Sequence, residues 1–149
     1  MEADVFGTMY HAIMQQIYNR YRNKTVVPDT LNAIAQNDEY LTGLIEQAFA
    51  EHYFRQKEKP RELTGHHYLI GEILRDYVKQ TLRFDTAFTP FEYIDSEHRF
   101  RSVYQVSDEL SVNVKGSIDR IDKVAGHIRI IDYKSGKGEL KFKDIDQLF

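Results

Sequence analysis

The sequence predicts a single α+β domain, residues 1–149, in which a helical N-terminal region precedes a group of β-strands. A change of pattern along the chain and the overall composition predict it. Apolar residues recur at helical spacing as far as about residue 82, and from about Phe88 they recur at every second position among Val, Ile, Tyr and Phe. In addition, 149 residues of which 42% are hydrophobic and 13% aromatic can build one substantial core, which excludes a disordered chain.

The N-terminal region is predicted to contain three helical stretches. The first covers about the first twenty residues, and its apolar stripe comprises Val5, Phe6, Met9, Tyr10, Ile13, Met14, Ile17, Tyr18 and Tyr21. A second follows Pro28 and is expected to break near Asn37, and a third runs from Thr64, a candidate N-cap, to about Leu82. The charged stretch 56–62, which contains a proline, is expected to be a loop.

The C-terminal half is predicted to form three strands in a meander. They cover residues 91–106, 110–122 and 128–134 and are separated by turn-prone stretches. Residues 144–149 then show the acid-then-apolar pattern of a helix start. Because a domain rarely ends one turn into a helix, we expect a domain that is truncated at its C-terminus and excised from a longer protein.

The composition excludes several kinds of site. The sequence has no cysteine, so this chain holds no disulfide, thiolate-bound zinc or iron-sulfur cluster, and a metal must bind oxygen and imidazole ligands, which favours hard divalent cations. No signal-peptide pattern or long apolar run is present, so we expect a cytoplasmic protein without a membrane partner. The net charge of -3 is unusual for a sequence-independent DNA binder, although residues 115–149 carry eight Lys or Arg against six acids.

Strand alternation gathers candidate catalytic residues on two neighbouring strands. In the second strand, one face carries Val112, Val114, Gly116 and Ile118, and the other carries Asn113, Lys115, Ser117 and Asp119. In the third strand, Asp132 and Lys134 share a face with Ile128 and Ile130. A carboxylate at the end of such a strand is costly unless something binds it, and a divalent cation held by Asp119 and Asp132 would do so.

Taken alone, an Asp and a Lys two positions apart at a strand end are more often a surface ion pair. The combination of two segments favours another interpretation. Residues 116–122 (GSIDRID) followed by residues 130–136 (IIDYKSG), with Asp119 and Asp132 thirteen positions apart, resemble two successive motifs of the RecB-like nuclease family in the PD-(D/E)XK superfamily. The resemblance implies a restriction-endonuclease-like core, with a mixed sheet of about three or more strands flanked by helices.

A histidine in the first predicted helix fits the same resemblance. Residues 6–11 (FGTMYH) match the family's pattern of a glycine, a few residues and then a histidine, here His11. His11 lies roughly 130° from the centre of the apolar stripe, which argues against a packed core histidine and leaves a solvated surface histidine as the alternative. Gly7, one turn earlier on the same face, leaves space over the imidazole. The other five histidines are assigned no role.

The resemblance implies a role for each motif residue. Mg²⁺ or Mn²⁺ would be bound by His11, Asp119, Asp132 and the backbone carbonyl of Tyr133. Lys134 would orient the attacking water and offset phosphate charge, so the predicted catalytic residues are Asp119, Asp132 and Lys134. Gln147 begins a further motif of the family and would hold Lys134 or the DNA strand.

Two positions are left open by the sequence. The family has an acid in the strand before the glycine motif, and Glu97 is the nearest match while Glu92 competes; solvent-facing strand residues are the favoured interpretation of both. Arg120 faces away from Asp119, where pairing with Asp122 or packing along its stem is as reasonable as a DNA contact. It is assigned no catalytic role.

The predicted function is metal-dependent hydrolysis of DNA phosphodiester bonds by an exonuclease. By resemblance, the parent protein would be a helicase-nuclease of the AddB or RecB type in double-strand break repair, with DNA and a helicase region or partner subunit as partners. One alternative is a degenerate nuclease fold that binds DNA or a partner subunit without cleavage. Another is a ligand-binding α+β domain or scaffold, which predicts that His11, Asp119 and Asp132 lie far apart.

Overall fold

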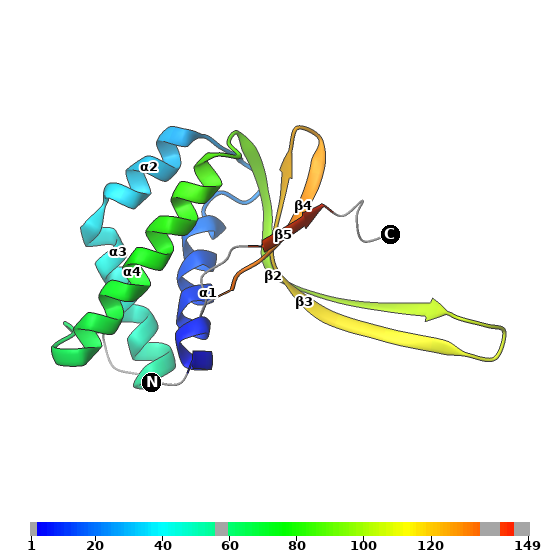
Figure 1. Ribbon diagram of the computed structural model, residues 1–149, viewed down its shortest axis with the longest axis horizontal. Coiled ribbons are helices and arrows are strands. Elements are labelled where there is room, and N and C mark those ends of the chain that lie inside the picture. Colours follow the sequence, from blue (N-terminus) through cyan, green and yellow to red (C-terminus); the bar gives the residue numbers. More distant parts are fainter. Residues whose placement is uncertain (1–2, 56–59, 135–140, 145–149) are drawn as a thin grey trace.

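A computed structural model describes residues 3–55, 60–134 and 141–144, in which a layer of helices packs against one end of a β-sheet (Figure 1). The elements are α1 (Ala3–Asn19), β1 (Thr25–Val26), α2 (Pro28–Gln36), α3 (Asp38–Ala48), a π-helix η1 (Phe49–Tyr53), α4 (Gly65–Thr86), β2 (Phe91–Gln105), β3 (Ser111–Val124), β4 (His127–Asp132) and β5 (Lys141–Asp144). The predicted α+β class and its restriction-endonuclease-like arrangement are confirmed.

The sheet follows the order of the chain, β1-β2-β3-β4-β5. Each neighbouring pair is antiparallel, so the mixture of strand directions expected from the sequence is not seen among the described strands. The expectation of a helix beginning at Asp144 needs correction, because Asp144 is the last residue of β5 and lies opposite Arg129 of β4. A free sheet edge offers backbone partners that override the local helical pattern. Residues 145–149 lie outside the described part of the chain.

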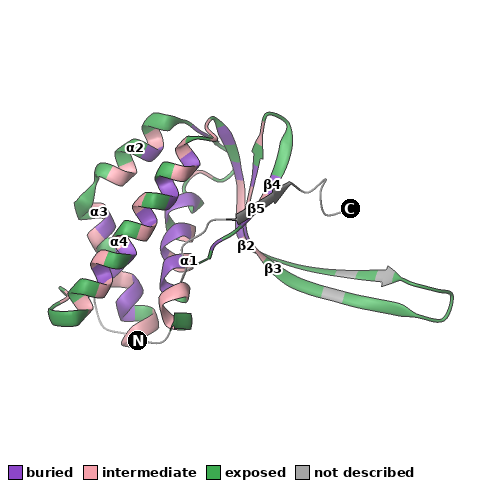
Figure 2. Ribbon diagram, in the orientation of Figure 1, coloured by how far each residue is buried: buried purple, intermediate pink, exposed green. Residues whose placement is uncertain are grey.

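The helical layer buries the predicted stripe of α1 against its neighbours. Met9, Tyr10, Ile13, Met14, Ile17 and Tyr18 are all buried, and the buried faces of the helices meet in the interior (Figure 2). The predicted break at Asn37 is observed, and its side-chain oxygen accepts a hydrogen bond from the Tyr40 amide at 3.1 Å. Helix α4 continues to Thr86, four residues past the predicted end, and this extension carries the buried Asp85.

Strands β2 and β3 form a long hairpin that leaves the helical layer (Figure 1). Its inner part joins the core through Phe91 and Tyr93, whereas its described outer residues are exposed, as Figure 2 shows. A bulge between Tyr93 and Asp95 shifts the strand register before the hairpin projects. On one face, a side chain at Gly116 would lie 3.0 Å from the ring of Phe100, so only a glycine fits without movement of that ring.

None of the helices in the described ranges is long and apolar enough to cross a membrane.

Candidate metal centre and active site

Three side chains from three elements converge where the hairpin leaves the helical layer. They are His11 of α1, Glu97 of β2 and Asp119 of β3. His11 Nδ1 lies 3.3 Å from Glu97 Oε1 and 3.6 Å from Asp119 Oδ1. One ligand atom from each residue falls within 4.8 Å of the others. An imidazole nitrogen and two carboxylates at this separation suit one hard divalent cation.

The backbone of Tyr133 completes the cluster from β4's C-terminal end. Its amide donates a hydrogen bond to Asp119 Oδ2 at 2.7 Å, and its carbonyl oxygen lies 3.3 Å from His11 Nε2. If Nε2 carries the imidazole proton, it donates to this carbonyl and leaves the Nδ1 lone pair directed toward Glu97 and Asp119. This is the tautomer that binds a cation, with the carbonyl fixing the ring.

Asp132 and Lys134 lie beside this cluster rather than inside it. Lys134 Nζ is 2.7 Å from Asp132 Oδ2, and both side chains are more than half exposed, at 57% and 54%. The carboxyl groups of Asp132 and Asp119 interact, so Asp132 lies next to the three-residue group without belonging to it. Gln147 lies outside the described residues.

The two neighbouring carboxyl groups have opposite shifts in pKa. Burial raises the pKa of Asp119 to about 6, and its hydrogen bond with Asp132 adds to the rise. Partial burial disfavours ionisation of Asp132, but hydrogen bonds with Lys134 and Asp119 outweigh it and hold the pKa of Asp132 below its ordinary value. A cation bound between these ligands would replace the proton that Asp119 holds below about pH 6.

An open pocket of about 540 Å³ gives access to the cluster. Its lining includes Gly7, His11, Glu97 and Arg99. The position of Gly7 beside the imidazole agrees with the space inferred from the sequence, and the pocket is wide enough for a ligand larger than a cation.

Glu97 belongs to the cluster, although the sequence favoured a solvent-facing strand residue at this position. It is half-buried and faces His11, whereas Glu92 is exposed and lies opposite Lys123 on β3. Simple alternation fails here because the bulge at Ile94 changes which residues of β2 face the core, and Glu97 itself has a φ of 52°. Only the order of motifs in the family singled out Glu97.

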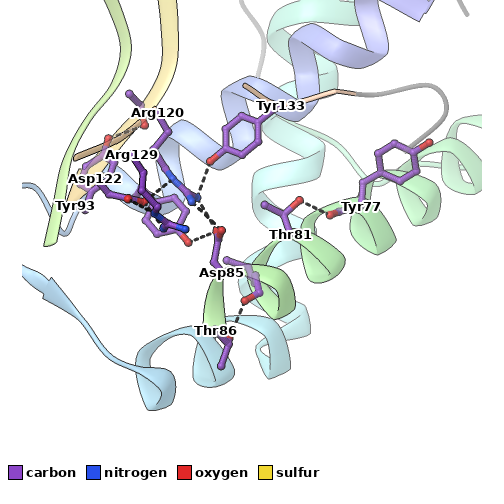
Figure 3. Close-up of polar contacts among 12 residues, drawn as sticks. Tyr77, Thr81, Asp85, Thr86, Tyr93, Arg120, Asp122, Arg129 and Tyr133 are labelled. Atoms are coloured by element: carbon purple, nitrogen blue, oxygen red, sulfur yellow. Dashed lines mark hydrogen bonds and ion pairs between the residues drawn. The ribbon is translucent and has the colours of Figure 1, made fainter. Parts of the chain in front are cut away.

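Charged residues also occupy the interior, which the sequence pattern did not reveal. Arg120 is fully buried and donates two hydrogen bonds to Asp85 at 2.6 and 2.8 Å and one to the Tyr133 hydroxyl at 2.9 Å (Figure 3). Arg129 donates two more to Asp122, at 2.7 and 2.8 Å. In β4 the buried side chains are thus Arg129 and Ile131, and Tyr133 directly after the strand is buried with them, whereas Ile128 is exposed and Ile130 half-buried.

The fold and the candidate ligands together define a class of protein, an α+β domain with a candidate divalent-metal site. Next to this site, β4 ends at Asp132 and is followed by Tyr133 and Lys134. The family model described as the PD-(D/E)XK nuclease superfamily matches residues 1–149, and the chain belongs to this superfamily. No curated protein matches the chain. Nucleases of this superfamily are generally metal-dependent phosphodiesterases, and membership implies a nucleic acid substrate.

Proposed function

We propose that this chain is a Mg²⁺- or Mn²⁺-dependent deoxyribonuclease. The observation that carries the proposal is the convergence of His11, Glu97 and Asp119 with the Tyr133 backbone, next to Asp132 and Lys134. The finer proposal is a cytoplasmic exonuclease module of a RecB- or AddB-type helicase-nuclease in double-strand break repair. That part is supported only by the resemblance of residues 116–122 and 130–136 to the motifs of the RecB-like family.

The chemistry divides between the cluster and the neighbouring lysine. A bound divalent cation supplies charge neutralisation at the phosphate and a more acidic water. His11, Glu97 and Asp119 would hold it, with Asp132 as a further ligand. The family resemblance also implies the Tyr133 carbonyl as a ligand, but here this carbonyl faces His11 Nε2 rather than Nδ1 and would orient the imidazole instead. Lys134 is exposed and forms an ion pair with Asp132, and from this position its ammonium would hold a water and offset phosphate charge.

The two alternatives differ in how well they fit the geometry. A scaffold whose acids form ordinary surface pairs predicts that the candidate ligands lie far apart, which is contrary to the 3.6 Å between His11 and Asp119. A degenerate nuclease fold predicts the loss of part of the motif. Asp119, Asp132 and Lys134 are all present and adjacent, which favours the catalytic interpretation.

Cleavage of linear DNA in Mn²⁺ and in EDTA tests the proposal directly. We expect cleavage only with the metal, and we expect Asp119→Asn and Lys134→Ala to reduce the rate by about a hundredfold or more. Lys123→Ala, an exposed lysine on the same strand as Asp119, is the matched control and should retain activity. Activity unaffected by the first two substitutions would overturn the assigned roles.

Calorimetry with Mn²⁺ separates a catalytic site from a degenerate one. We expect saturable binding that Asp132→Ala weakens, because the carboxylates carry the charge that attracts the ion. A degenerate site would show no binding sensitive to that substitution.

A further inference from the structure

Three basic residues lie on the face of the β2–β3 hairpin that carries the candidate site. Along β3, Lys115 and Asp119 project to the same side, because side chains alternate and the two residues are four positions apart. Arg101 of β2 lies directly opposite Lys115, so the two share this face. Arg99, two positions nearer the site, lines the same pocket as His11. We call Arg99, Arg101 and Lys115 the basic row.

Among the described residues, the charges of the basic row have no partners. All three side chains are exposed, and none forms an ion pair or hydrogen bond with another residue in the described part of the hairpin or helical layer. Arg101 and Lys115 moreover place two like charges directly across the sheet, an arrangement that destabilises a strand pair. A bound anion would relieve this repulsion, so the charges are better explained by a ligand than by the fold.

The spacing of the basic row fits the backbone of a nucleic acid. At about 3.3 Å per strand residue, Arg99 and Arg101 lie roughly 7 and 13 Å along β2 from Glu97. Residues two apart on the strand are therefore about 6.6 Å from each other, and charges at this spacing can contact successive phosphates of one nucleic-acid strand. Asp108 and Glu109 at the hairpin tip would repel phosphates, which confines such a contact to the part of the hairpin nearer the site.

We propose that the basic row binds the sugar-phosphate backbone of the DNA strand that flanks the cleaved bond. The site thus extends from the metal centre along the hairpin, and Arg99 joins the two regions. This inference rests on the proposed nuclease function for the identity of the substrate. The binding contact itself requires no catalysis, so the two can be tested separately.

The test is salt-dependent binding in EDTA, where metal-dependent cleavage does not occur. The probe is a short fluorescein-labelled DNA duplex with a single-stranded tail, and its anisotropy is followed at several salt concentrations. We expect Arg101→Gln and Lys115→Gln each to reduce the slope of log K against log salt by about one and to weaken binding by up to about fivefold. Arg83→Gln removes an exposed arginine of α4 and should change neither quantity.

Thermal unfolding of the same variants guards against a folding artefact. Since Arg101 and Lys115 repel each other, Lys115→Gln should leave the melting temperature unchanged or raise it. The proposal is overturned if the parent chain shows no salt-dependent binding, or if the hairpin variants and Arg83→Gln behave alike. A reduced salt dependence in the Arg101→Gln and Lys115→Gln variants, with a parent chain that does not cleave DNA in Mn²⁺, would support the basic row and reject the nuclease. Metal-dependent cleavage by the parent chain, with DNA binding unchanged in the hairpin variants, would support the nuclease and reject the basic row.

Discussion

Tyr133 connects the buried interior to the candidate metal centre through opposite ends of one residue. Its hydroxyl accepts a hydrogen bond from Arg120 and its ring packs 5.5 Å from that of Tyr10, while its backbone contacts Asp119 and His11. Burial raises the pKa of the Tyr133 hydroxyl well above its ordinary value, so the phenol stays neutral. The packing of one aromatic ring therefore sets the position of a candidate metal ligand.

Substitutions at Tyr133 should separate ring packing from hydrogen bonding. Tyr133→Phe keeps the ring but leaves a buried Arg120 donor without its acceptor, so we expect a loss of about 1–3 kcal/mol in the free energy of unfolding with Mn²⁺ affinity nearly unchanged. Tyr133→Ala should lower both, because the ring no longer holds the backbone. Urea unfolding and calorimetry measure the two effects. Equal loss of Mn²⁺ affinity in both variants would mean that the hydroxyl, not the ring, positions the ligands.

Arg120 and Asp85 form a buried pair whose members depend on each other. Burial opposes the charge on Arg120, but Asp85 outweighs this effect and raises the pKa of Arg120 well above its ordinary value. The Tyr18 hydroxyl donates a further hydrogen bond to Asp85 at 2.5 Å. The pair thereby ties α1, α4 and β3 together.

We expect Arg120→Met to lower the free energy of unfolding by about 3–5 kcal/mol, because it leaves Asp85 charged and buried. The control is Arg22→Met, which breaks the exposed pair with Asp95 at 2.8 Å and should cost no more than about 1 kcal/mol. The double variant Arg120→Met/Asp85→Leu should regain part of the loss. Equal effects of the two single substitutions in urea unfolding would contradict this account.

At the scale of elements, the hairpin divides into an inner part supported by the core and an outer part without such support. Phe91 and Tyr93 of β2 and Asp122 of β3 are buried, whereas Val103 and Val112 are exposed. Local opening costs less free energy where few buried contacts must break.

Hydrogen exchange should show this division directly. Amides of residues 99–105 and 111–117 are expected to exchange faster than those of residues 91–96 and 119–124, although all take part in one strand pair. Mass spectrometry of peptides from the two parts measures the difference. Equal protection would indicate that the outer hairpin is packed against something other than the helical layer.

The elements that the sequence predicted are those long enough to show a period. The stripe of α1 and the alternation of β3 span several repeats, so burial on one side leaves a readable pattern. By contrast, β1 has two residues and β5 has four, and they exist because the edges of the longer strands offer backbone partners. Such elements depend on tertiary context that local patterns do not contain.

At the scale of the whole molecule, the candidate site was predictable where it followed one element's geometry. The helical angle placed His11 outside the core stripe, and alternation placed Asp119 off the apolar face of its strand. Glu97 was not predictable from alternation, since a bulge shifts its strand. Nor did the sequence distinguish the buried Arg120 from a surface arginine, because its partner Asp85 lies 35 positions away.

Global stability should depend on pH and on metal through Asp119. Its folded-state pKa of about 6 exceeds the ordinary value of 3.8, so the metal-free folded protein binds this proton more tightly than the unfolded chain does. The stabilising contribution is complete below about pH 4 and is lost as the pH rises through about 6. Because Mn²⁺ at the proposed site would replace the proton, its stabilising effect should grow over the same range.

Thermal unfolding with Mn²⁺ or EDTA, near pH 5 and near pH 7.5, measures this dependence. The increase in melting temperature caused by Mn²⁺ should be larger at the higher pH, and Asp119→Asn should abolish most of it. An increase that is the same at both pH values, or that survives in the variant, would show that Mn²⁺ binds elsewhere.

The contact between His11 and the Tyr133 carbonyl joins residues 122 positions apart, with Glu97 and Asp119 contributed in between. Contacts of such high sequence separation form late, since long stretches of chain must be ordered first. A partly synthesised or partly folded chain therefore lacks the arrangement that would hold the cation. If the proposed deoxyribonuclease activity resides here, metal-dependent cleavage would begin only after the helical layer and the sheet have come together.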